Sequence, residues 1–164
     1  MAELMAQPLL VITLLACLVA TLTDLYNMRI PNALTLSMWF VGLVGNASLG
    51  NWQIGVYGFA SAFAIHFTLW KLGVQKGGDA KLLIGIGALM GPGFMLATSM
   101  WYAIFYLPIS GFVLWRRGRL SNLGKAAHHV AATATHGVEA RAPEATMMVT
   151  GPIIAAATVM ACLW

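Results

Sequence analysis

The 164-residue chain is 60% hydrophobic and only 9% charged, with a formal net charge of +4. Soluble domains carry about 25% charged residues, so this composition excludes an ordinary soluble protein and indicates a membrane protein. Basic residues in the loops of a membrane protein contact anionic lipid, and this accounts for the small positive charge. We therefore expect membrane lipid, and no nucleic acid, as a partner.

Six apolar stretches follow one another along the chain and predict an all-α, polytopic membrane protein with a single domain over residues 1–164. A helix that crosses a bilayer needs about 20 residues, so the fourth stretch is short for a crossing. The six predicted spans are residues 8–22, 33–49, 54–72, 80–90, 93–115 and 145–163. The polar stretch 116–144 is predicted to be a cytoplasmic linker, either a helix on the membrane surface or a mobile segment.

Basic residues show a strong bias in their placement. All nine Lys and Arg residues lie in or beside the connections between spans 1 and 2, 3 and 4, and 5 and 6. Cytoplasmic loops are enriched in Lys and Arg, so we expect these connections to face the cytoplasm and both termini to lie outside.

Two aspartates, Asp24 in TDLYNMRIPN and Asp79 in KGGDAKLL, each adjoin an apolar segment. An ionisable side chain within or beside a membrane span is costly to keep there, which makes each a candidate functional residue. The structural alternatives are a helix N-cap for Asp79 and a solvated loop residue for Asp24. The predicted topology places both at the cytoplasmic side at similar depth, which favours a joint function.

Two carboxylates held close together can share one proton, because like charges a few Å apart cannot both ionise. The ionised group can then activate a water molecule while the protonated group polarises a carbonyl. This is the chemistry of an aspartic protease.

Residues around the aspartates are expected to support them. Gly77 and Gly78 allow a close approach of backbone, which suits a substrate bound in extended form. Pro31 and Asn32 begin the second span and keep Asp24 near the membrane. Lys81 either extends its ammonium group to the membrane surface or tunes Asp79 electrostatically.

Metal chemistry is not indicated by the sequence. The histidines His128, His129 and His136 match no HExxH or Cys/His ligand pattern, so we expect them to be solvated. His66, inside the third span, is expected to bond to a neighbouring helix. We expect neither a metal ion nor another cofactor.

At these motifs the chain resembles the type IV prepilin peptidases, specifically the short form that serves Flp/Tad-type pili. The resemblance rests on DLYNMRIPN, on GGDAKLL and on TGPIIAAA at residues 150–157. The family signature is Gly-x-Gly-Asp, and Lys76 stands where its first glycine is expected. That substitution raises the question of whether the local backbone is strained.

The resemblance implies an intramembrane aspartic endopeptidase with Asp24 and Asp79 as its catalytic residues. Members of the family remove the basic leader of prepilins or pseudopilins at the cytoplasmic face, which implies a bacterial inner-membrane location. Larger members also methylate the new N-terminus through a four-cysteine domain. This chain has no such insertion between spans 1 and 2 and no CxxC motif, so peptidase activity without methylation is expected.

Two other functions are compatible with the sequence. A small proton-coupled transporter could use the two carboxylates as a proton relay, although the chain shows no internal repeat. A non-catalytic pilus assembly factor would carry the aspartates without chemistry.

Overall fold

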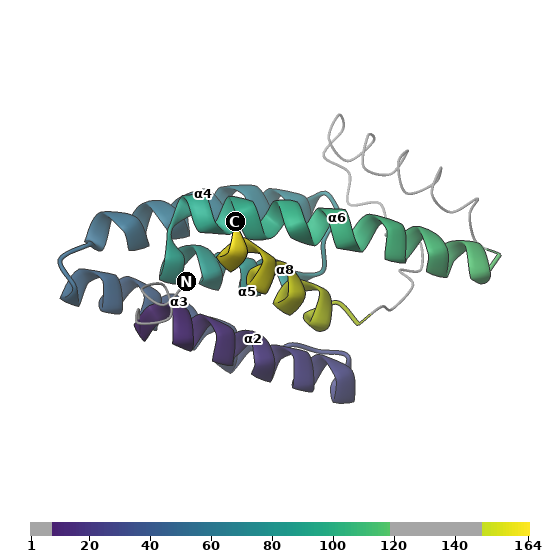
Figure 1. Cartoon of the computed structure of the whole chain (residues 1–164), viewed down its shortest axis with the longest axis horizontal. Helices are drawn as coiled ribbons and strands as arrows, with labels where there is room; N and C mark the ends of the chain where they lie inside the picture. The colour runs from purple at the N-terminus through teal and green to yellow at the C-terminus, as the bar shows by residue number, and fades with distance from the viewer. Residues whose placement is uncertain (1–7, 119–148) are drawn as a thin grey trace.

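The structure, a computed structural model, describes residues 8–118 and 149–164. This part of the chain is helical and has no strand, which confirms the all-α prediction (Figure 1). In chain order the helices are α2 (Pro8–Asn27), α3 (Asn32–Ser48), α4 (Trp52–Lys71), α5 (Gly77–Met90), α6 (Pro92–Arg116) and α8 (Gly151–Leu163).

Helix α5 forms the centre of the bundle. It contacts α2, α3, α4 and α6, and from Asp79 to Leu89 all its residues except Lys81 are buried. A helix that is apolar all round is stable only when other helices surround it. Its 14 residues, short for a membrane crossing, therefore act as the core on which the longer helices pack.

Large apolar side chains cover much of the outer surface, among them Leu15, Leu18 and Leu107, which are more than half exposed. Hydrocarbon is a good solvent for such a surface. Helices α2 and α6 are long and apolar enough to cross a membrane, whereas α8 is apolar but shorter. That the other helices also cross the membrane stays a prediction, as does the orientation of the termini.

Small residues bring α4 and α5 into backbone contact. A Cβ atom on Gly58 would overlap the carbonyl oxygen of Gly87 and approach Gly91 Cα to 2.7 Å. A Cβ atom on Gly87 would in turn approach Gly58 O to 2.6 Å. Glycine at these positions is typical of helix packing in membranes, where close backbone approach replaces the hydrophobic effect as the driving force.

We expect Gly58→Ala to destabilise the fold by about 1–3 kcal/mol, because a backbone carbonyl cannot move aside as a side chain can. Gly111→Ala is a matched control, since a Cβ atom there meets nothing within 4 Å. It removes a helical glycine and should be neutral or stabilising by up to about 1 kcal/mol. Thermal unfolding in detergent measures both, and equal stability of the two variants would contradict the packing argument.

Several predicted boundaries differ from the observed ones. Helix α2 continues to Asn27, five residues past the predicted end, so Asp24 lies inside the helix rather than after it. Helix α3 begins at Asn32, with Pro31 at its N-cap. Residues 149 and 150 precede α8 without being helical, so the predicted start at residue 145 is wrong at least there. Most of the predicted 116–144 linker lies outside the described residues, and Arg116 belongs to α6.

Candidate functional site

Asp24 is buried near the C-terminal end of α2, with only 2% of its surface exposed. A carboxylate is disfavoured at that end of its own helix, because the helix dipole is negative there. Backbone amides at the start of α8 offset this effect. Asp24 Oδ2 accepts hydrogen bonds from the backbone amides of Thr150 (2.7 Å) and Gly151 (2.8 Å).

Those two amides are available because the first N–H groups of a helix have no partner within it. The sequence Thr150-Gly151-Pro152 suits the arrangement. A Cβ atom on Gly151 would approach Asp24 Cβ and Thr21 Cα, each to 3.1 Å, so glycine lets α8 lie close against α2. Pro152 lies at the start of α8, where a missing N–H costs no hydrogen bond.

Asp79 lies in the first turn of α5 and is also 2% exposed. Its Oδ1 accepts a hydrogen bond of 2.7 Å from the Thr150 hydroxyl, and its Oδ2 accepts one of 3.3 Å from the Tyr102 hydroxyl on α6. Asp79 lies inside the first turn rather than before it, so it does not serve as the N-cap of α5. The N-cap position is taken by Lys76.

Thr150 therefore joins the two aspartates. Its backbone N–H binds Asp24 and its hydroxyl binds Asp79, so one residue of the segment leading into α8 holds carboxylates from α2 and α5. Residues 24 and 79 are far apart in sequence, and this bridge fixes how they face each other. The solvated-loop alternative for Asp24 is excluded by its burial.

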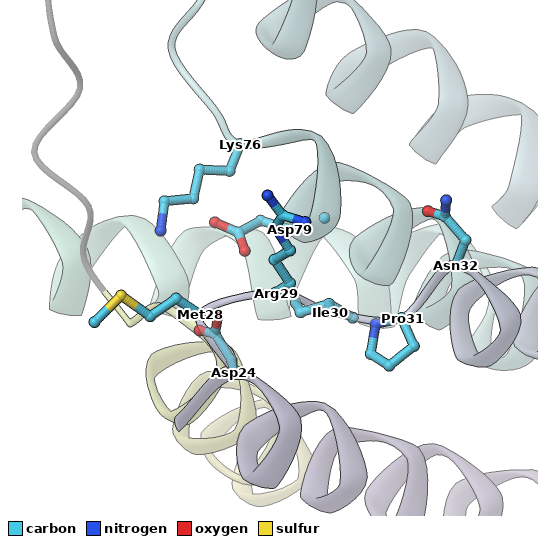
Figure 2. A pocket seen from close by; sticks show the side chains of 9 residues that line it. Asp24, Met28, Arg29, Ile30, Pro31, Asn32, Lys76 and Asp79 are labelled. Carbon is cyan, nitrogen blue, oxygen red and sulfur yellow. The ribbon is translucent and has the colours of Figure 1, made fainter. Parts of the chain in front are cut away.

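A cavity of about 700 Å³ opens beside the two carboxylates. Figure 2 shows both side chains turned toward it, Asp24 from α2 and Asp79 from α5. The cavity is large enough for a peptide segment and water together with the paired carboxylates. Its lining residues are Asp24, Met28, Arg29, Ile30, Pro31, Asn32, Lys76, Gly78 and Asp79.

The backbone at Lys76 is extended, with φ −70° and ψ 146°, a conformation open to any residue. Lysine in place of the signature glycine is therefore accommodated without strain. Its side chain lines the same cavity as Asp24 and Asp79 (Figure 2). Together with Arg29, it places two cations around a cavity that holds two carboxylates.

The other predicted supporting residues divide into two groups. Pro31, Asn32 and Gly78 line the cavity. Lys81 and Gly77 instead line a second hollow between α3, α4 and α5. Lys81 Nζ donates a 2.9 Å hydrogen bond to Asn32 Oδ1, so it fastens the start of α3 and lies outside the cavity lining.

His66 holds the connection that precedes Asp79. The imidazole is 2% exposed on α4, with Nδ1 at 3.0 Å from Gln75 Oε1 and Nε2 at 3.1 Å from Ser99 Oγ on α6. The expected bond from His66 to a neighbouring helix is confirmed. Gln75 immediately precedes Lys76, so the imidazole ties the α4–α5 connection to the rest of the bundle.

Two substitutions separate the two ring contacts. Asparagine places a polar atom near the position of Nδ1, and glutamine near that of Nε2. His66→Gln, which loses the Gln75 contact, is expected to raise amide hydrogen exchange over residues 72–80 by about tenfold. His66→Asn, which keeps that contact, should exchange much as the wild type does. Equal protection in both variants would show that the imidazole does not fix this connection.

Sequence reasoning missed Thr150 and Tyr102 as site residues. For Tyr102 no local signal exists, because an apolar helix with scattered aromatics gives no reason to choose one tyrosine. Thr150 begins the TGPIIAAA motif, and a polar residue before Gly-Pro at a helix start indicates a capping segment. That signal could have located the start of α8, where unpaired backbone N–H groups can bind an acidic side chain.

Comparison with known proteins now gives the family. A model of the type IV leader peptidase family matches residues 11–114, a range that includes both aspartates. The chain belongs to this family. The contact from Thr150 lies beyond the matched range, so this type IV leader peptidase family member supplies part of its site from a segment that the match does not cover.

The chain is also similar to a curated protein. The prepilin peptidase EppA of Methanothermobacter thermautotrophicus is 31% identical over 86 residues, which cover 48% of this chain and 22% of the relative. The chain therefore spans about a fifth of the length of the curated relative that it matches. No solved structure gives a significant match.

Proposed function

We propose that the chain is an aspartic endopeptidase that removes the basic leader of Flp-type prepilins at the cytoplasmic face of the bacterial inner membrane. The observation that carries the proposal is the pair of buried aspartates, both bound to Thr150 and both facing one cavity. Membership of the type IV leader peptidase family supports peptide hydrolysis as the reaction.

The proposed mechanism uses the aspartates as one acid–base pair. One carboxylate takes a proton from water, and the resulting nucleophile attacks the scissile carbonyl carbon. The other aspartate, protonated, gives its proton to the carbonyl oxygen. When the tetrahedral intermediate collapses, the C–N bond breaks and the leaving nitrogen takes up a proton from the pair. The products are a carboxylic acid and an amine.

The start of α5 is suited to hold the substrate backbone. The first amides of α5 have no partner within the helix, and Gly78 exposes backbone to the cavity without a side chain in the way. An extended peptide could accept hydrogen bonds there, with its scissile bond beside Asp79.

Peptidase activity without methylation is also proposed. Helix α2 ends at Asn27 and α3 begins at Asn32, so the short connection between them leaves no room for an inserted domain. The positions of Arg29 and Lys76 at the cavity suit a cytoplasmic opening under the positive-inside rule.

The proposed function is tested with purified protein in detergent and a prepilin that has a basic leader and a glycine at the cut. We expect intact mass to fall by the mass of the leader, and EDTA to leave the rate unchanged. A prepilin with a bulky residue in place of that glycine should stay uncut. Absence of cleavage, with proton flux in liposomes that depends on Asp24, would favour the transporter instead.

A further inference from the structure

Met28 has a backbone conformation that, among the other described residues, only glycines adopt. Its φ is +52°, and it is the single non-glycine residue with positive φ in residues 8–118 and 149–164. The four other positive-φ positions there are Gly50, Gly73, Gly91 and Gly118. A side chain is disfavoured in this left-handed region, because Cβ crowds the following carbonyl oxygen.

The local structure explains why the left-handed turn forms. Helix α2 ends at Asn27, and the amide of Met28 donates a 2.9 Å hydrogen bond to Asp24 O. A left-handed residue directly after a helix closes it in this way, and glycine is the usual residue there. The turn itself therefore does not require methionine.

Packing does not explain the methionine either. The residue is 51% exposed and lies in neither buried core cluster. It does line the cavity beside the aspartates, and Figure 2 shows it next to Asp24. A strained residue that lines a site and lies outside the core leads to a hypothesis about function.

We propose that Met28 determines specificity by contacting an apolar side chain of the bound substrate next to the scissile bond. A thioether side chain is apolar, flexible and polarizable, so it adapts to aliphatic or aromatic partners. Arg29 and Lys76 give charge to the same cavity, whereas Met28 and Ile30 supply apolar surface. The inference rests on the proposed function, since the substrate is the peptide that is cut.

Three substitutions separate strain from recognition. Glycine and asparagine adopt positive φ readily, so Met28→Gly and Met28→Asn remove both the strain and the apolar side chain. Met28→Leu keeps an apolar side chain and keeps the strain. We expect the first two to raise Tm by about 2–4 °C, as removal of strain in a chain of this size predicts. The same two variants should lower kcat/KM about five- to tenfold, mainly through KM, because a buried apolar contact is lost. Met28→Leu should stay within about twofold of the wild type in kcat/KM, without a gain in Tm.

Gly50→Ala is the matched control. It places a side chain at φ +78° in open space, far from the cavity lining, and should lower Tm while kcat/KM stays unchanged. A prepilin with alanine in place of its apolar residues beside the cut should also be insensitive to Met28→Gly.

The outcomes are distinguishable. If the wild type cuts no prepilin, the proposed function fails, while the Tm values still decide whether Met28 is strained. If the wild type cuts and Met28→Gly and Met28→Asn cut equally well, the specificity inference is overturned. An unchanged Tm in both of these variants would overturn the strain on which the inference stands.

Discussion

Asp24→Asn and Asp79→Asn are each expected to abolish the proposed removal of the prepilin leader. Asparagine keeps the shape of aspartate but cannot take a proton from water or give one to a carbonyl oxygen. General acid–base catalysis alone contributes about 10²–10⁴-fold, and loss of the activated water adds to that. Because the two side chains act as a unit, the double variant should be little slower than either single one.

Both asparagine variants can keep the hydrogen bonds of the site, so a loss of cleavage would report on chemistry rather than on folding. In Asp24→Asn the amide oxygen can still accept from the backbone of Thr150 and Gly151. In Asp79→Asn the oxygen can accept from the Thr150 hydroxyl and the NH₂ group can donate to Tyr102. Cleavage is scored by gel shift, with Tm and elution volume as folding controls. Near-normal cleavage by either well-folded variant would exclude the aspartates as the catalytic pair.

Thr150→Val is expected to lower kcat about 10- to 100-fold with a smaller change in KM, because a hydrogen bond to a carboxyl pair that carries one negative charge contributes about 1.5–3 kcal/mol. Valine keeps the shape of threonine and the backbone N–H that binds Asp24, and it removes the hydroxyl that binds Asp79. The loss would therefore come from a misplaced Asp79.

Thr150→Ser is the matched control, since it retains the hydroxyl and should stay within about threefold of the wild type. Full activity of Thr150→Val, or equal loss in Thr150→Ser, would show that the bridge does not position Asp79.

Local signals in the sequence were sufficient to predict the helices of residues 8–118 and 149–164, and they singled out two aspartates as candidates. Apolar runs between turn residues predicted six helices, and the cost of a buried carboxylate singled out Asp24 and Asp79. Their burial beside one cavity agrees with the joint function expected from topology. Their catalytic role is a proposal.

What the sequence could not predict depends on contacts between distant segments. The first span was predicted to end at residue 22, yet α2 continues to Asn27. Helix α8 packs against α2, and the amides of Thr150 and Gly151 make a buried Asp24 acceptable inside the helix. One of the two roles considered for Lys81 was to tune Asp79, but the rotation of α5 places Lys81 on the side of Asn32. Neither the partner of an orphan carboxylate nor the rotation of a buried helix is encoded in local periodicity.

The bridge from the start of α8 also determines when the site can form during synthesis of the chain. During synthesis the chain emerges from its N-terminal end, so α2 and α5 are made long before residues 150 and 151. A nascent chain that already contains both aspartates still lacks the amides and the hydroxyl that hold them. The proposed protease would thus become competent only when α8 is in place, so a nascent chain without α8 would not cut neighbouring membrane proteins.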